Sequence, residues 1–141
     1  MLYLDTSALV KLYVREVDSD VVRALVRAAT HVATSRIAYV EARAAFARRA
    51  RERALSTRGL RQVVEVLERD LGAWVMVEAS DEVVRLAGEL AERHALRGYD
   101  ALHLASASAL ATWLSDAVVF LAYDARLMAA ATAEGLSRPE P

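Results

Sequence analysis

Cysteine is absent from this chain of 141 residues, which excludes disulfide bonds and thiolate metal sites. Long hydrophobic runs are absent too, since no apolar stretch approaches the roughly 20 residues that a membrane-spanning helix needs. The first apolar residues are too few for a secretory signal peptide, and no basic segment precedes them. We therefore expect a soluble cytoplasmic protein without a membrane partner.

Proline and glycine are scarce, and the few that occur do not mark a linker. The only two prolines are Pro139 and Pro141, and the five glycines are scattered. With 55% apolar residues, a chain of this length can form one domain with a hydrophobic core. We expect a single domain over residues 1–135, followed by a frayed tail over residues 136–141.

Lysine is almost missing, so nearly all the positive charge is arginine. Lys11 is the only lysine, and arginines are concentrated between residues 43 and 61, where Glu52 is the only acid. A solvated helix face is the ordinary interpretation of such a run. The alternative is a surface that contacts RNA phosphates, because the planar guanidinium group fits phosphate oxygens. The candidates for this second interpretation are Arg43, Arg48 and Arg49.

The rest of the sequence alternates short apolar segments with amphipathic ones. Apolar residues predict strands over residues 2–5, 31–34, 74–77 and 117–122. Helical spacing predicts helices between and after these strands, including one that Ser35 caps and a nearly all-apolar one over residues 99–114. Short apolar strands separated by helices are typical of a parallel sheet covered on both faces. The predicted fold is α/β: a helix-rich, three-layer α/β/α sandwich with a central parallel sheet.

Four acidic residues stand where this fold could bring them together. Asp5 and Asp124 follow the first and last predicted strands, Asp100 lies just after Gly98, and Glu41 lies within an apolar helix. Taken singly, each aspartate could cap or complement a helix N-terminus. A carboxylate on a largely buried helix, however, needs a partner or a metal ion. Because ligands gather beyond the carboxyl ends of parallel strands, we expect the four acids to meet at that edge of the sheet.

Such a cluster needs a counter-ion. Two carboxylates about 5 Å apart repel each other by roughly 3 kcal/mol at an effective dielectric constant near 20. All-oxygen ligands favour Mg²⁺ or Mn²⁺ over Zn²⁺. One or two such ions held by carboxylates are a common device for phosphodiester cleavage.

The three histidines are weaker candidates. His103 lies three residues after Asp100, so the two side chains share a helix face. In a helix as apolar as this one, we expect a histidine that is buried and hydrogen-bonded in the core. The paired histidines of a zinc-binding helix are absent.

Four segments follow one another along the chain: LDTSALVKLY, SRIAYVEARAAFARR, RGYDALHLASA and VVFLAYDARLMAAA. In order and spacing they resemble the PIN domain family, and in particular the VapC-like toxins of bacterial toxin–antitoxin pairs. The resemblance covers residues 1–135 and implies a PIN-like, metal-dependent endoribonuclease that hydrolyses RNA. It implies catalytic roles for Asp5, Glu41, Asp100 and Asp124. Asp5 and Asp100 would be the principal ligands of Mg²⁺ or Mn²⁺, and Glu41 and Asp124 would bind directly or through water.

The same resemblance implies three partners: an RNA substrate, a separately encoded antitoxin protein and a second copy of the chain in a homodimer. Many relatives carry Thr or Ser two residues before the last acid, where this chain has Ala122. Thr6 or Ser7 could supply the missing hydroxyl, although Ser7 could equally be a helix N-cap.

Other functions remain compatible with parts of the pattern. A PIN-domain nuclease of RNA processing would carry the same acids, and a non-catalytic PIN-like module would bind RNA without needing all four. A receiver-type signalling domain would need a phospho-accepting aspartate after a central strand and a lysine near the end of the chain. The single lysine is Lys11, and no aspartate follows residues 75–78 at the required position.

Overall fold

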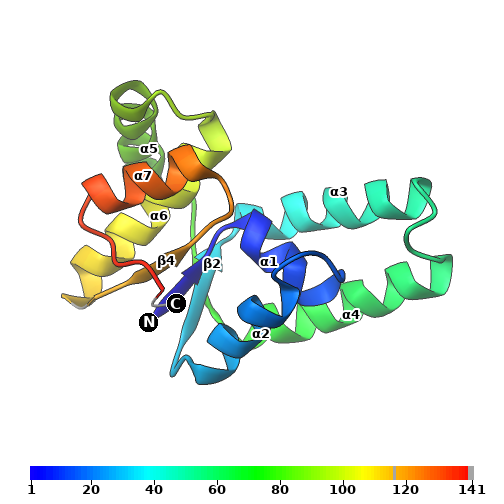
Figure 1. Cartoon of the computed structure of the whole chain (residues 1–141). Coiled ribbons are helices and arrows are strands. Elements are labelled where there is room, and N and C mark those ends of the chain that lie inside the picture. Colours follow the sequence, from blue (N-terminus) through cyan, green and yellow to red (C-terminus); the bar gives the residue numbers. More distant parts are fainter. Residues whose placement is uncertain (116, 140–141) are drawn as a thin grey trace.

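Short apolar segments form a four-stranded parallel sheet at the centre of the computed structural model, which describes residues 1–115 and 117–139 (Figure 1). The strands are β1 (Leu2–Leu4), β2 (Val32–Ser35), β3 (Val75–Val77) and β4 (Val119–Leu121). Their order in the sheet is β3–β2–β1–β4. Leu2 aligns with Val32 on one side and with Val119 on the other. The first strand of the chain therefore lies inside the sheet, next to the last.

Helices cover both faces of the sheet, which confirms the predicted three-layer α/β/α sandwich. Figure 1 shows α1 to α4 on one side of the strands and α5 to α7 on the other. The helices are α1 (Thr6–Tyr13), α2 (Ser19–Ala28), α3 (Ile37–Arg51), α4 (Thr57–Ala73), α5 (Asp81–His94), α6 (Gly98–Leu114) and α7 (Ala125–Ala133). The hairpin of α3 and α4 extends away from the sheet as an arm (Figure 1).

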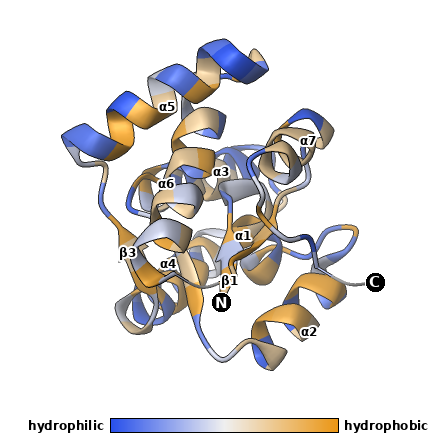
Figure 2. Ribbon diagram, turned by 90° about the vertical axis from the view of Figure 1, so that its left-hand side faces the viewer, coloured by the Kyte–Doolittle hydropathy of each residue, from blue (hydrophilic) through white to orange (hydrophobic). Residues whose placement is uncertain are grey.

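Alternate residues of each strand supply two hydrophobic cores, one on each face. Tyr3 and Phe120 belong to the core under α5 to α7, whereas Leu4 and Leu121 belong to the core under α1 to α4. Figure 2 shows hydrophobic residues along β3 and mixed hydrophilic and hydrophobic residues on the outer helix α5. Helix α6 is buried from Ala101 through Ala107, as its apolar sequence predicts. Even so, no helix of residues 1–115 and 117–139 is both long and apolar enough to cross a membrane.

Ser35 differs from its expected role as a helix cap. It is the last residue of β2 and pairs with Val77 of β3, and the ladder continues with a 2.8 Å bond from the Arg36 N–H to the Val77 carbonyl. Helix α3 begins only at Ile37, and its N-cap residue Arg36 makes no capping side-chain bond. The prediction of a Ser35 cap is wrong because strand pairing occupies this residue.

The chain after α7 also differs from the expected tail. Gly135 turns the chain with a φ of 83°, and Leu136 is buried. The Ser137 N–H donates to Val118 over 3.1 Å, and the Ser137 carbonyl accepts from Phe120 over 2.9 Å. The start of the expected tail is therefore hydrogen-bonded to the edge of the sheet next to β4. Residues 140–141 of the expected tail lie outside the described residues.

Candidate active site

Asp5 stands where the first strand ends and the first helix begins. Its carboxylate caps α1, since Oδ1 accepts a 2.9 Å hydrogen bond from the Ala8 N–H. The Asp5 N–H donates to the carbonyl of Leu121, the last residue of β4, over 3.1 Å. Only 5% of Asp5 is exposed. The interpretation of Asp5 as a helix cap is thus correct, and the same carboxylate lines the cavity described below.

Ser7 links Asp5 to the loop that carries Asp124. The Ser7 hydroxyl donates to the Asp5 carboxylate, at 2.8 Å from Oδ1 and 3.0 Å from Oδ2. It also accepts a 2.9 Å bond from the N–H of Tyr123. The alternative in which Ser7 is the N-cap of α1 is wrong, because Asp5 occupies that position.

Glu41 projects from α3, and two polar side chains hold one of its oxygens. Its Oε2 accepts a 2.5 Å hydrogen bond from the Thr6 hydroxyl and lies 2.8 Å from Nε2 of His103. The Thr6 hydroxyl and His103 Nε2 are themselves 2.9 Å apart. His103 is buried, as expected of a core histidine, but its ring also reaches the predicted site.

Asp100 and Asp124 share one arginine. The Arg97 Nε donates to Asp100 Oδ2 over 2.8 Å, and its Nη2 lies 3.8 Å from Asp124 Oδ2. Asp100 lies in the first turn of α6, and Asp124 caps α7 through a 2.9 Å bond from the Leu127 N–H. Arg97 therefore places a positive charge between two of the four acids.

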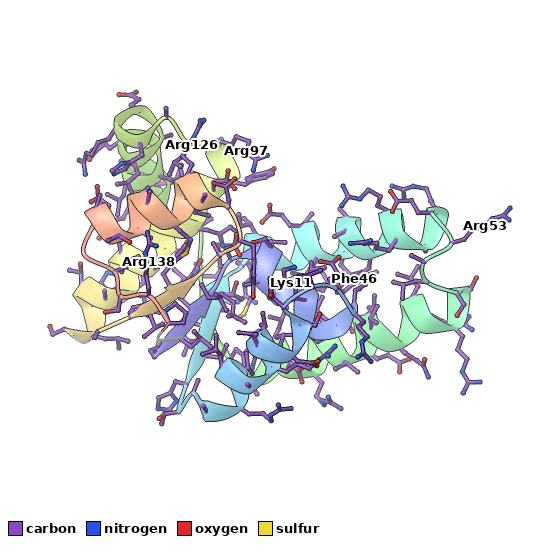
Figure 3. All side chains as sticks on the ribbon, in the orientation of Figure 1. Lys11, Phe46, Arg53, Arg97, Arg126 and Arg138 are labelled. Atoms are coloured by element: carbon purple, nitrogen blue, oxygen red, sulfur yellow. The ribbon has the colours of Figure 1, made fainter. Side chains whose placement is uncertain are left out.

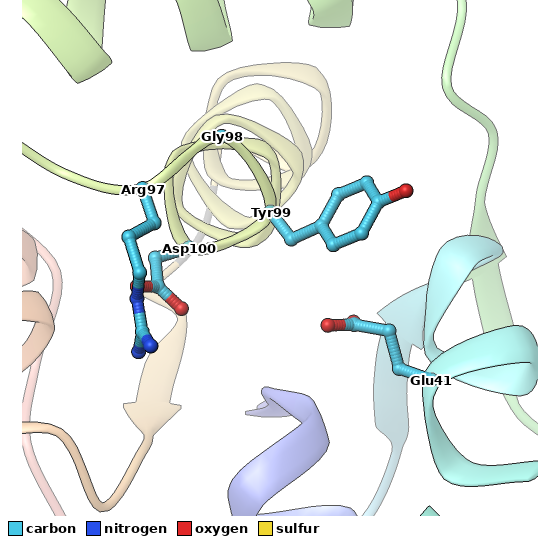
Figure 4. A pocket seen from close by; sticks show the side chains of 5 residues that line it. All are labelled: Glu41, Arg97, Gly98, Tyr99 and Asp100. Atoms are coloured by element: carbon cyan, nitrogen blue, oxygen red, sulfur yellow. The ribbon is translucent and has the colours of Figure 1, made fainter. Parts of the chain in front are cut away.

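The four predicted acids meet at one cavity of about 390 Å³. We call it the acidic cavity, and it is also lined by Thr6, Ser7, Lys11, Arg48, Arg49, Arg97 and His103. Glu41, Arg97, Gly98, Tyr99 and Asp100 enclose an adjoining space of about 380 Å³. In this space the Glu41 side chain extends from α3 toward the start of α6, where Arg97 and Asp100 lie together (Figure 4). The fold therefore gathers residues from both ends of the sequence.

Asp5 and Glu41 respond differently to their surroundings. Burial raises the pKa of the Asp5 carboxyl and the charge of Asp100 adds to this, although His103 and the bonds from Ala8 and Ser7 act in the opposite direction. Burial also acts to raise the pKa of Glu41, but the bonds from His103 and Thr6, aided by the charge of Arg97, lower it below its ordinary value. In this cavity, burial therefore opposes the ionised form of Asp5, whereas hydrogen bonds favour the ionised form of Glu41.

The structure separates the three arginines that the sequence groups as RNA-binding candidates. Arg48 and Arg49 line the acidic cavity, and Arg49 forms an ion pair there with Glu16. Arg43 contacts Tyr39 and Glu68 and lines a different hollow between α3 and α4. Farther along the run, Arg53 lies at the tip of the arm, away from Arg97 (Figure 3).

The chemistry of the donor set suits a hard divalent cation. Four carboxylates line one cavity, and oxygen ligands of this kind are those that Mg²⁺ and Mn²⁺ prefer. Within residues 1–115 and 117–139, however, no three Asp, Glu or His side chains lie close enough together to hold an ion as they stand. The carboxylates fit such an ion by charge and type, and in this structure Arg97 contacts two of them, Asp100 and Asp124.

Two residues of the site are not identified from the sequence: Arg97, and His103 as a contact of Glu41. Both lie three positions from Asp100 and so share a helix face with it or flank its turn. Their spacing of three positions from Asp100 is the sequence signal that could have identified Arg97 and His103. The apolar neighbours of His103 hid its second role, because a histidine can be buried in the core and still touch a polar site.

Comparisons with known proteins agree along nearly the whole chain. The family model described as PIN domain matches residues 2–134. Two ribonucleases of Mycobacterium tuberculosis, VapC45 and VapC49, are each 39% identical to this chain over 135 residues, which cover 96% of the chain and 92% of either relative. Ribonuclease VapC35 of the same organism is 36% identical over 143 aligned positions, covering 100% of the chain and 97% of the relative.

Solved structures are similar at lower sequence identity. VapC20 of Mycobacterium tuberculosis, described as a sarcin–ricin loop cleaving toxin, superposes with a TM-score of 0.72 at 17% identity, with 100% of both chains covered. FitAcB from Neisseria gonorrhoeae gives a TM-score of 0.65 at 19% identity, covering 98% of this chain and 96% of the other. At these identities the likeness establishes the fold alone.

Proposed function

Because this chain belongs to the PIN domain family, we propose that it is an endoribonuclease that acts as the toxin of a toxin–antitoxin pair. The observation that carries this proposal is the convergence of Asp5, Glu41, Asp100 and Asp124 on the acidic cavity. The ribonuclease names of relatives that align over 96% of the chain support it.

In this function the chain's own residues prepare the cavity for a phosphodiester. Ser7 and the Ala8 N–H fix both oxygens of Asp5, while Thr6 and His103 fix one oxygen of Glu41. Asp5 and Asp100 would be the principal ligands of Mg²⁺ or Mn²⁺, with Glu41 and Asp124 completing the set directly or through water. A divalent ion held there would supply an activated water and neutralise charge that develops on the phosphate.

Positive charge at the rim would hold the RNA backbone. Arg48 and Arg49 line the same cavity as the acids, and Lys11 lies over the Tyr123 ring at 4.4 Å from its centre. A guanidinium group can donate two parallel hydrogen bonds to a phosphate. Such contacts would position the RNA strand without reading its sequence. Membership of the family supports the other proposed partners, an antitoxin protein and a second copy of the chain, and a proposed cytoplasmic location.

Cleavage assays with two variants test the proposal. Wild-type protein, Asp5→Asn and Asp81→Asn are purified and incubated with structured RNA in Mn²⁺ and in EDTA. Asp81 is the matched control, because it is also an acid at a helix start but lies on α5, outside the cavity. We expect cleavage by wild type and Asp81→Asn in Mn²⁺, and none by Asp5→Asn or in EDTA. Cleavage that survives both EDTA and Asp5→Asn would overturn the mechanism.

Expression in a bacterial host separates the toxin from an RNA-processing nuclease. Growth arrest on induction of the wild type, absent for Asp5→Asn, is expected of a toxin. Normal growth together with metal-dependent cleavage in vitro would favour RNA processing instead.

A further inference from the structure

A chain of polar side chains runs from the buried core to the acidic cavity. It begins at Tyr3 on β1, whose hydroxyl lies 3.1 Å from Nδ1 of His103 on α6. The opposite ring nitrogen, Nε2, lies 2.8 Å from Glu41 Oε2 on α3. Tyr3 is fully buried and His103 is 2% exposed, whereas Glu41 lines the acidic cavity. This series of side chains therefore has an inner end at Tyr3 and an outer end at Glu41. Because both side chains are buried, water does not compete for the contact between the Tyr3 hydroxyl and His103.

When the His103 ring is neutral, one arrangement of protons satisfies the contacts of its two nitrogens with Glu41 and Tyr3. An ionised carboxylate only accepts hydrogen bonds, so the proton between His103 and Glu41 belongs to Nε2. In a neutral imidazole the other nitrogen is then an acceptor, and the Tyr3 hydroxyl donates to it. The Thr6 hydroxyl donates to the same Oε2 of Glu41 over 2.5 Å. The Glu41 carboxylate thereby selects this tautomer of His103, and the Tyr3 hydroxyl satisfies its Nδ1.

Ring packing holds the inner end of this series of side chains, and hydrogen bonds hold its outer end. The Tyr3 ring stacks on Phe120 of β4, with centroids 5.5 Å apart and planes inclined by 11°. The His103 ring meets Tyr3 edge-on, at an interplanar angle of 77°. At the outer end both donors bind Oε2, which leaves Oε1 of Glu41 without a hydrogen-bond partner in the part of the chain that the structure describes. Figure 4 shows this carboxylate directed into the space next to Asp100.

We propose that His103 is a positioning residue for the nuclease reaction: the Tyr3 hydroxyl binds its Nδ1, and its Nε2–H holds one oxygen of Glu41 so that the other faces the cavity. This inference rests on the proposed function. His103 itself does not touch RNA, because it is buried. It acts through Glu41, so its loss should lower the rate of the chemical step and leave RNA binding nearly unchanged.

Nuclear magnetic resonance reports the tautomer directly and without any metal or substrate. Long-range ¹H–¹⁵N correlation spectra of the full chain should show the proton of the neutral His103 ring on Nε2 and none on Nδ1. Tyr3→Phe keeps the stacked ring and removes only the hydroxyl, so it should leave Nδ1 without its partner and increase the mobility of the His103 ring. A His103 signal with the proton on Nδ1, or on both nitrogens, would overturn the proposed directions of the hydrogen bonds from Tyr3 to His103 and from His103 to Glu41.

Steady-state kinetics test the role in the reaction. His103→Leu should reduce kcat by about 10-fold to 100-fold, the usual effect of removing a group that orients a metal-site carboxylate, with KM for RNA changed by less than about threefold. His103→Gln should recover most of kcat, because its amide N–H can occupy the place of Nε2–H. Tyr3→Phe should reduce kcat by about twofold to tenfold, the effect of one hydrogen bond.

Two matched controls lie outside the cavity. His94→Leu removes a histidine whose Nε2 lies 2.6 Å from Glu134, and Tyr13→Phe removes a hydroxyl that donates to Asp70 over 3.2 Å. Both should leave kcat unchanged, whatever they do to the melting temperature. Equal kcat for His103→Leu and His103→Gln, or equal losses in the controls, would show a merely structural role and overturn the inference.

The assays also separate failure of the inference from failure of the proposed function. Wild-type protein that cleaves no RNA in Mn²⁺ overturns the proposed function and, with it, the role of His103 in a reaction. Wild-type protein that cleaves normally while His103→Leu and Tyr3→Phe keep full kcat overturns the inference alone.

Discussion

Asp5 and Glu41 line the same cavity, yet their pKa values shift in opposite directions. Asp5 is 5% exposed, and burial is the main reason that its pKa is raised. The Glu41 pKa is lowered because hydrogen bonds from His103 and Thr6 outweigh burial. By linkage, these opposite shifts give the two residues opposite effects on stability as the pH changes.

Glu41→Gln should destabilise the protein at neutral pH by about 1–2 kcal/mol, the worth of hydrogen bonds to a charged acceptor. A lowered folded-state pKa means that Glu41 adds stability above its unfolded pKa and loses it as the pH falls through the folded pKa. The deficit of the variant should therefore shrink as the pH falls from neutral to below the ordinary glutamate pKa of 4.5. Urea unfolding of wild type and variant across this range measures it, and a deficit that grows at acid pH would contradict the assignment.

Asp5→Asn should show the reverse trend. The folded state binds the Asp5 proton more tightly than the unfolded state, so wild-type stability falls as the pH rises from the unfolded pKa through the folded one. Asparagine caps a helix about as well as aspartate and carries no charge. The stability of the variant relative to wild type should thus increase with pH in the same urea titrations. A constant difference would mean that Asp5 has the same pKa in both states.

Arg97→Gln should tighten the binding of Mn²⁺ by about twofold to fivefold. The guanidinium neutralises Asp100 and Asp124 in the free protein, so an ion must displace it from its 2.8 Å and 3.8 Å contacts. Isothermal titration calorimetry measures the change, with Arg126→Gln as a control on the same side of the molecule (Figure 3). Weaker binding in Arg97→Gln would mean that the arginine supports the ion instead of competing with it.

At the scale of elements, helix α3 presents arginines to two different places. Arg48 lines the acidic cavity, whereas Arg43 faces α4 through Glu68. Arg48→Glu should therefore weaken RNA binding and reduce the slope of log K against log salt by about 1 or more, as expected when a phosphate contact is lost. Arg43→Glu, the same change five residues away, should leave that slope nearly unchanged. Fluorescence anisotropy in EDTA, which should prevent cleavage under the proposed mechanism, gives both values, and equal effects would show that the arm binds RNA as a whole.

Much of the fold at the scale of elements could be predicted from the sequence, because the spacing of apolar residues that distinguishes strands from helices depends only on nearby residues. Apolar runs such as residues 117–122 and acids such as Asp5 and Asp124 just beyond them indicate a parallel sheet with a polar edge. The convergence of the four acids on one cavity follows from that topology. Their roles as catalysts and metal ligands stay predictions.

Other features depend on contacts between residues far apart in the chain. Ser35 has the residue type of a helix cap, but its pairing with Val77, 42 positions later, keeps it in the strand. His103 has the neighbours of a core residue, and only the approach of α3 to α6 brings it to Glu41. The sequence groups Arg48 with Arg43 although they line different hollows, because solvent-facing residues carry no periodic signal that separates them.

At the scale of the whole molecule, the acidic cavity joins elements that are far apart in sequence but adjacent in space. Asp5 follows β1, Glu41 lies on α3, Asp100 begins α6 and Asp124 follows β4, so the site connects both helical layers with the sheet between them. An ion bound by these four carboxylates can bind only the folded state, since the unfolded chain does not hold the acids together. Binding of the ion should therefore stabilise the entire fold and not one element.

Mn²⁺ should raise the unfolding free energy by about 2.7 kcal/mol when the free ion is 100 times its dissociation constant. The gain should grow with the logarithm of the ion concentration, and EDTA should abolish it. Differential scanning calorimetry of wild type, Asp5→Asn and Asp81→Asn measures the effect in the absence of RNA. Asp5→Asn should lose most of the stabilisation because it lacks a proposed principal ligand, whereas Asp81→Asn should keep it. The same gain in all three proteins would place the ion elsewhere on the surface, and the acidic cavity would then need another explanation for its four carboxylates.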